Sequence, residues 1–265
     1  MTKKEEKNKE QRDLTFNGMT ATEWAHHSRS VWKDLPSPKE YSKIPNMDVL
    51  PLELLDRLIS MYSKEGDVVF DPFMGAGTTI ISAIRNNRFC YGSEIHKKVF
   101  DIAKFNVENS INLLVNGDYE LMNMDAFLAT ERIEDETIQL IITSPSKPSI
   151  SKRKKKDENS LDFGDDKYEE YLKNIEDLMR RLYRITKKGG YAVFIVEDYR
   201  DIKNNKPYVE FHADIAKKGI KAGYLYQDVI IYDHNDQRGL LLQGYPKIFY
   251  ANLNHKYIVV LRKTR

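Results

Sequence analysis

The chain has 265 residues, which is enough for one large hydrophobic core with a modest appendage. Charged residues make up 31% of it but the formal net charge is only +2, so the overall charge does not indicate a nucleic-acid partner. The single cysteine, Cys90, excludes an internal disulfide and a multi-cysteine zinc site, and no apolar run is long enough to span a bilayer. We therefore expect a cytoplasmic protein without a metal site or a membrane association.

The N-terminal region is predicted to have three parts. Residues 1–18 are expected to form a disordered charged tail. In residues 19–44, Trp24 and Trp32 are expected to anchor an N-terminal arm onto the core, which is the usual fate of large aromatic side chains. Leucine and isoleucine at helical spacing then predict a helix over residues 51–63.

Further along the chain, apolar runs that favour strands alternate with amphipathic segments that favour helices. Strands are predicted at 67–71, 89–94, 119–124, 137–143, 191–197, 225–233 and 257–262. Helices are predicted at 77–86, 96–109, 167–187 and 209–222, with Gly189-Gly190 ending the third of them. The alternation predicts an α/β fold with a mostly parallel seven-stranded sheet and helices on both faces. In such sheets ligands bind beyond the carboxyl ends of the strands.

A glycine-rich turn joins the first of these strands to its helix. The apolar run 68–70 is followed by Asp71-Pro72-Phe73-Met74-Gly75-Ala76-Gly77-Thr78-Thr79. The glycines are expected to let the backbone approach a ligand, and the following helix directs its free N–H groups at that ligand. The turn is neither a P-loop, which needs a Lys-Ser/Thr pair, nor a dinucleotide fingerprint, which needs a third glycine.

This nine-residue string resembles the cofactor loop of the amino-methylating DNA methyltransferases, which use S-adenosylmethionine to methylate cytosine N4 or adenine N6. The resemblance covers about residues 23–263 and implies a single Rossmann-like class I methyltransferase domain over residues 19–265. Glu94, at the end of the second strand, would hold the ribose hydroxyls, and Asp125, after the third strand, would face the adenine. The implied cofactor-binding residues are Pro51, Asp71, Pro72, Phe73, Gly75, Gly77, Thr78, Glu94 and Asp125.

The family places its catalytic loop after the fourth strand, as Asp or Ser followed by Pro-Pro and an aromatic residue. In that loop an oxygen and a proline carbonyl accept hydrogen bonds from the target amine, and the aromatic ring stacks on the extruded base. This chain keeps Ser144 and Pro145 but has Ser146 in place of the second proline and Lys147 in place of the aromatic residue. Losing a stacking surface costs about 1–3 kcal/mol in base binding.

The resemblance implies double-stranded DNA with its target base flipped out as the substrate, and either a restriction endonuclease or a second copy of the chain as a partner. The loops at 146–166 and 233–255 are expected to face the DNA, and the five cations from Lys152 to Lys156 would neutralise phosphates. Ser144 at the head of the loop favours cytosine N4. Two alternatives stay open: a methyltransferase fold that binds cofactor or DNA but has lost efficient transfer, and methylation of an RNA base.

Overall fold

The computed structural model describes residues 17, 19–36, 49–110, 118–148, 167–204, 206–234 and 250–264. The predicted tail, apart from Asn17, lies outside the described residues, and so do the run of cations at 152–156 and most of the two loops expected to face DNA.

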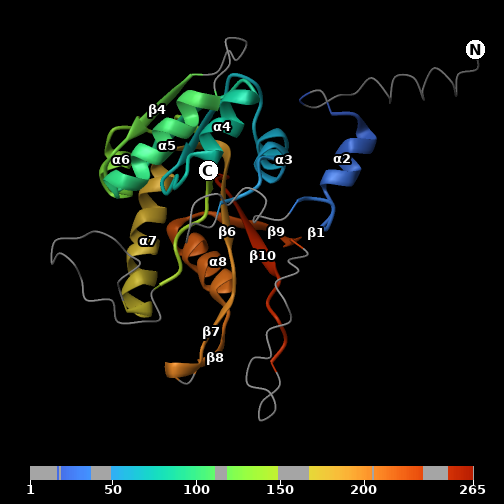
Figure 1. The fold of residues 1–265 in the computed structure, drawn as a ribbon, viewed down its shortest axis with the longest axis vertical. Helices are drawn as coiled ribbons and strands as arrows, with labels where there is room; N and C mark the ends of the chain where they lie inside the picture. Colours follow the sequence, from blue (N-terminus) through green and yellow to red (C-terminus); the bar gives the residue numbers. More distant parts are fainter. Residues whose placement is uncertain are drawn as a thin grey trace, which may run out of the picture.

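One eight-stranded sheet organises the molecule, in the order β1-β9-β10-β6-β5-β2-β3-β4 (Figure 1). β10 is antiparallel to both of its neighbours, and the other adjacent strands whose register is described are parallel, as the sequence predicted. Seven strands lie at predicted positions, whereas the two-residue β1 is too short to give an alternating pattern. The strands are β1 (Val31–Trp32), β2 (Val68–Asp71), β3 (Phe89–Ser93), β4 (Tyr119–Met122), β5 (Ile138–Thr143), β6 (Thr186–Val196), β9 (Leu225–Asp233) and β10 (His255–Arg262).

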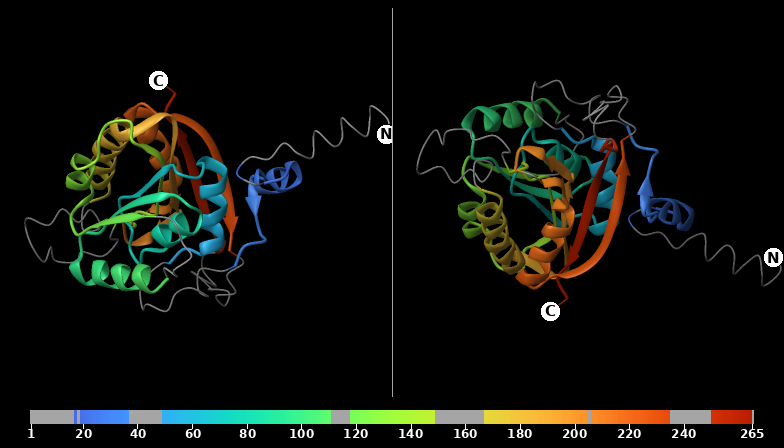
Figure 2. Two further views of the ribbon diagram at one scale, coloured as in Figure 1. Left: turned by 90° about the horizontal axis from the view of Figure 1, so that it is seen from above. Right: turned by 90° about the horizontal axis from the view of Figure 1, so that it is seen from below.

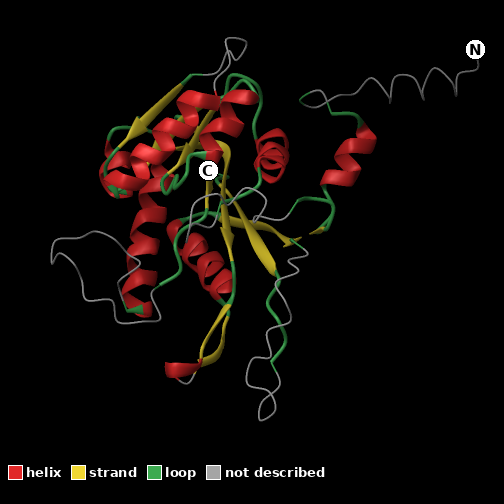
Figure 3. Ribbon diagram, viewed as in Figure 1, coloured by secondary structure: helices red, strands yellow, loops and turns green. Residues whose placement is uncertain are grey.

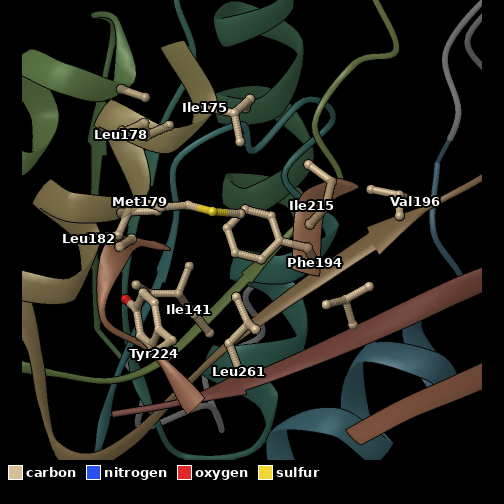
Figure 4. Packing of buried hydrophobic residues seen from close by; sticks show 14 of the residues in the cluster. Ile141, Ile175, Leu178, Met179, Leu182, Phe194, Val196, Ile215, Tyr224 and Leu261 are labelled. Atoms are coloured by element: carbon tan, nitrogen blue, oxygen red, sulfur yellow. The ribbon is translucent and has the colours of Figure 1, made fainter. Parts of the chain in front are cut away.

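Helices cover both faces of this sheet, as predicted (Figures 2 and 3). The apolar stripes of α3 (Leu52–Tyr62), α4 (Thr78–Arg85) and α5 (Lys97–Ser110) pack on one face. Those of α6 (Ala126–Glu131), α7 (Tyr168–Ile185) and α8 (Phe211–Ala222) pack on the other. Figure 4 shows this second core, in which Met179 of α7 and Leu261 of β10 surround Phe194 of β6. No helix in the described ranges combines the length and the apolarity that a bilayer crossing requires.

The N-terminal arm consists of α2 (Ala21–His27) and β1, which pairs with β9 at the edge of the sheet. Trp32 is 1% exposed, its Nε1 donates to His27 O at 2.9 Å, and the Arg57 guanidinium lies 4.9 Å from its ring centroid. Trp24 is 40% exposed. Of the two tryptophans predicted to anchor the arm, Trp32 is the one that is buried.

The structure differs from the prediction where α7 gives way to β6. The helix ends at Ile185 and β6 begins at Thr186, so the chain passes through Gly189-Gly190 within the strand. Gly189 has a φ of +83°, and a Cβ at Gly190 would lie 2.9 Å from Gln139 O in β5. The glycines serve the irregular pairing of β5 with β6 and do not terminate the helix.

A small hairpin that the sequence pattern did not predict follows β6. It comprises β7 (Tyr199–Asp201), a 3-10 turn at Ile202–Asn204 and β8 (Lys206–Val209). Figure 1 shows it projecting past the end of the main sheet. Both strands are too short for an alternating pattern to stand out.

Candidate active site

The three predicted cofactor-binding acids lie at the carboxyl ends of neighbouring strands. Asp71 ends β2, Glu94 follows β3 and Asp125 follows β4, and these three parallel strands are neighbours. Because adjacent strands are about 4.8 Å apart, the ends of these three strands span about 10 Å. This spacing suits an elongated ligand better than an ion. The described part of the chain also contains no cluster of three or more His, Cys, Asp or Glu side chains that could hold a metal.

The glycine loop is fixed by hydrogen bonds and by close packing. Gly77 N–H donates to Met74 O at 2.8 Å, and Asn106 Nδ2 of α5 donates to Ala76 O at 3.0 Å. Gly77 has a φ of +84°, and a Cβ there would lie 3.1 Å from Val107 of α5. The left-handed turn and the closeness of α5 both favour glycine at this position.

Asp71 is a buried acid of the site, and its surroundings shift its pKa. It is 3% exposed, and its Oδ1 accepts hydrogen bonds from Phe73 N at 3.1 Å and from Thr143 Oγ1 at 2.8 Å. Burial raises the pKa of Asp71 to about 6, against the opposing effect of hydrogen bonds from Thr79, Thr143 and Phe73. Thr143 was not predicted as a site residue, although it directly precedes the Ser-Pro pair.

The other two acids are oriented by backbone N–H groups. Glu94 is half-buried, and its Oε1 accepts from His96 N at 2.9 Å. Asp125 is 6% exposed and caps α6, where its Oδ1 accepts from Phe127 N at 2.9 Å and from Leu128 N at 3.1 Å. Asp125 therefore has a structural role in addition to any contact with a ligand.

The remaining predicted cofactor-binding residues belong to the glycine loop or precede a helix. Pro72 is buried, and Phe73, Gly75 and Thr78 are half-buried, with Thr78 at the first position of α4. Pro51 is the N-cap of α3, which packs against α4.

The predicted catalytic loop follows β5, which is the neighbour of β2 in the sheet. Ser144 Oγ donates to Ile195 O at 2.9 Å, and because this bond uses the hydroxyl proton, the lone pairs of the oxygen face elsewhere as acceptors. Pro145 is buried. Ser146 is exposed, and its carbonyl accepts from the Tyr171 hydroxyl at 2.8 Å. The loop is therefore tied to both β6 and α7.

Lys147 is held in a three-residue ion network that sequence patterns did not reveal. Its Nζ pairs with Glu197, whose Oε1 also accepts from Lys256 Nζ at 2.6 Å. The Lys256 side chain is only 2% exposed. Burial disfavours the Glu197 carboxylate, but the charges of the two ammonium groups prevail and lower its pKa to about 2. The ammonium of Lys147 is thus directed at a stable anion.

Residues 1–105 match the N6/N4 DNA methylase family, which confirms the resemblance for the segment containing the glycine loop and Glu94. An orphan methyltransferase, M.BamHII of Bacillus amyloliquefaciens, is 35% identical over 112 residues, or 37% of this chain and 42% of that protein. The type II methyltransferase M.MthZI of Methanothermobacter thermautotrophicus is 32% identical over 115 residues, or 42% of this chain and 32% of that protein. The chain thus spans less than half the length of these two relatives.

Solved structures support the fold. A methyltransferase of the S-adenosylmethionine-dependent class from Methanosarcina mazei superposes with a TM-score of 0.51 at 10% identity, over 82% of this chain and 99% of that one. A methyltransferase from Pyrococcus furiosus gives a TM-score of 0.50 at 14% identity, over 84% and 87%. The predicted Rossmann-like methyltransferase fold is confirmed.

Proposed function

We propose that this chain, whose first 105 residues match the N6/N4 DNA methylase family, is a site-specific DNA methyltransferase that uses S-adenosylmethionine. Its target would be an exocyclic base amine, cytosine N4 rather than adenine N6, because Ser144 heads the loop. The observation that carries the proposal is the row of acids at the ends of β2, β3 and β4 beside the glycine loop. The domain would extend over residues 19–265, with the loops at 146–166 and 233–255 facing DNA and a restriction endonuclease or a second copy as a partner.

The cofactor half of the site would use the three carboxylates in different ways. S-adenosylmethionine supplies a methyl group bonded to a positively charged sulfur. Glu94, already oriented by His96 N–H, would accept hydrogen bonds from the ribose hydroxyls. Asp125 would face the adenine with the oxygen that does not cap α6. Asp71 would supply a buried negative charge beneath the glycine loop, where a cation stabilises the ionised form.

The target half would act through hydrogen-bond acceptors. An exocyclic amine is a weak nucleophile because its lone pair is delocalised into the ring. Ser144 Oγ, whose proton is engaged by Ile195 O, would accept one amine hydrogen, and the Pro145 carbonyl would accept the other. These acceptors become more favourable as the nitrogen gains positive charge. Because Glu197 pairs with the Lys147 ammonium, the positive charge of Lys147 would repel the developing charge on the nitrogen less strongly.

One observation favours a second candidate, a methyltransferase fold that binds cofactor or nucleic acid without efficient transfer. Lys147 stands where the family has its stacking residue, and its ion pair with Glu197 fixes it in a polar network. Methylation of an unpaired RNA base would meet the same obstacle, because that base also needs a stacking surface.

The test is incubation with tritiated S-adenosylmethionine and unmethylated DNA of mixed sequence, followed by nucleoside analysis. Label in N4-methylcytosine supports the proposal, and label in N6-methyladenine would correct the choice of base. Ser144→Ala should reduce incorporation at least tenfold, whereas Ser110→Ala, an exposed serine at the end of α5, should not. Cofactor binding by calorimetry without incorporation would favour the second candidate, and label in RNA alone would favour RNA methylation.

A further inference from the structure

The hairpin of β7 and β8 carries a tyrosine that is both exposed and rigidly held. Tyr208 is 41% exposed, and its hydroxyl donates to Asp198 Oδ2 at 2.9 Å. Asp198 is buried and accepts a second hydrogen bond from His212 N at 3.0 Å, so the carboxylate cannot turn away. Partial burial and the bond to Asp198 raise the pKa of the Tyr208 phenol, which keeps it a hydrogen-bond donor. A ring that is fixed before binding loses little conformational entropy when a ligand stacks on it.

A guanidinium group supports this ring. The central carbon of Arg200 lies 5.5 Å from the ring centroid of Tyr208 and 4.6 Å from that of Tyr250. Arg200 donates to Pro207 O at 2.8 Å within the hairpin and to Ala251 O at 2.9 Å in the segment before β10. These bonds tie the hairpin to that segment and hold a cation against two aromatic rings. Aromatic rings next to a cation are the features that bind unpaired bases without reading their sequence.

Tyr208 and the predicted catalytic loop are attached to consecutive residues. Lys147 of the loop pairs with Glu197, and Tyr208 bonds to Asp198, directly after β6. Both contacts therefore lie at the carboxyl end of β6, where the hydrogen bond from Ser144 to Ile195 also lies. Residues 144–147 of the predicted catalytic loop contain no aromatic side chain. The hairpin places Tyr208 at the same end of β6.

We infer that Tyr208, supported by Arg200, is the stacking surface for the unpaired target base of a DNA strand. The inference rests on the proposed function and adds a base-binding residue to it. The charge of Arg200 complements the phosphates that flank the base, and the exposed Tyr208 ring offers the flat apolar contact that Lys147 does not.

The experiment compares three variants with the full-length parent in binding a fluorescein-labelled single strand of mixed sequence, measured by anisotropy. Tyr208→Ala removes the ring, and Tyr208→Phe keeps the ring but loses the bond to Asp198. Tyr226→Ala is the matched control. Tyr226 is 37% exposed but lies near the start of β9, at the opposite end of the sheet strands from Tyr208. Binding of S-adenosylmethionine by calorimetry is measured on each.

Tyr208→Ala should weaken strand binding about 5- to 100-fold. Tyr208→Phe should weaken it less than Tyr208→Ala does, because the ring remains but is no longer held by Asp198, and Tyr226→Ala should stay within about twofold of the parent. All three should bind S-adenosylmethionine as the parent does, since the hairpin lies outside the cofactor half. A Tyr208→Trp variant should show tryptophan fluorescence in addition to that of Trp24 and Trp32. Binding of the strand should quench this additional fluorescence.

Two results would overturn the inference in different ways. If the parent methylates DNA and Tyr208→Ala binds the strand as well as the parent does, the stacking role is wrong and the proposed function stands. If the parent neither binds nor methylates DNA, both fail together. Equal losses in Tyr208→Ala and Tyr226→Ala would also overturn the role, because they would indicate a general loss of structure.

Discussion

Asp71→Asn measures the free-energy cost of burying a carboxylate at the proposed cofactor site while the packing of the side chain is kept. Asparagine keeps the shape of the side chain and an oxygen that accepts from Phe73 N and Thr143 Oγ1. The variant removes only the capacity to ionise. In the folded protein the pKa of Asp71 is raised from 3.8 to about 6 by burial. The carboxyl therefore binds its proton more tightly in the folded state than in the unfolded chain.

The sign and size of the effect on stability follow from that difference. The contribution of Asp71 to the free energy of unfolding is fully present below pH 4 and is lost as the pH rises through about 6. The difference between 3.8 and about 6, at 1.36 kcal/mol per pH unit, amounts to about 3 kcal/mol. Relative to the parent, Asp71→Asn should therefore gain about 3 kcal/mol between pH 4 and pH 8.

Urea unfolding of the parent and the variant at both pH values measures this gain, because other titrating groups cancel in the comparison. Asp118→Asn, which removes an exposed carboxylate, is the control and should show a much smaller change. A difference between Asp71→Asn and the parent that does not grow with pH would refute the reasoning. Asp71→Asn and Asp71→Ala should also lose S-adenosylmethionine binding by calorimetry, and retained affinity would remove Asp71 from the proposed site.

Three further outcomes are expected. Glu94→Gln should weaken S-adenosylmethionine binding about 10- to 100-fold in calorimetry, because hydrogen bonds to a charged group contribute about 1.5–3 kcal/mol; Glu120→Gln, on the exposed part of β4, should leave it unchanged. Lys147→Tyr should increase methyl transfer to DNA in the tritium assay, and a variant no more active than the parent would show that the missing aromatic ring does not limit it. Gly92→Ala should lower the free energy of unfolding by about 1–3 kcal/mol in urea titrations, because its Cβ would lie 2.7 Å from Met74 Sδ.

The arrangement of β2, the glycine loop and α4 could be predicted because all of its signals are local. An apolar strand, two glycines at positive φ and a helical stripe follow one another along the chain. Glu94 and Asp125 could be placed for the same reason, since each directly follows a strand, and parallel strands bring their ends together.

Side-chain contacts between distant segments could not be predicted in this way. Lys147, Glu197 and Lys256 lie on three separate segments, and nothing in their spacing pairs them. The position of Tyr208 could not be predicted either, because it depends on the hydrogen bond to Asp198 and on a hairpin whose strands are too short to give a pattern. Gly189-Gly190 misled the prediction because a glycine pair looks the same at a helix end as at a bulge between strands.

The bond from Thr143 Oγ1 to Asp71 Oδ1 joins the two proposed halves of the site inside the protein. Asp71 opens the glycine loop, and Thr143 is followed directly by Ser144. A ligand that changes the charge of Asp71 therefore changes the strength of the bond that positions the start of the other loop. Such coupling is reciprocal. If DNA binds at Ser144 as proposed, it would change the affinity for the cofactor by the same factor as the cofactor changes the affinity for DNA. A double-mutant cycle between Thr143→Val and Ser144→Ala, read out as cofactor affinity with and without DNA, would measure this thermodynamic linkage.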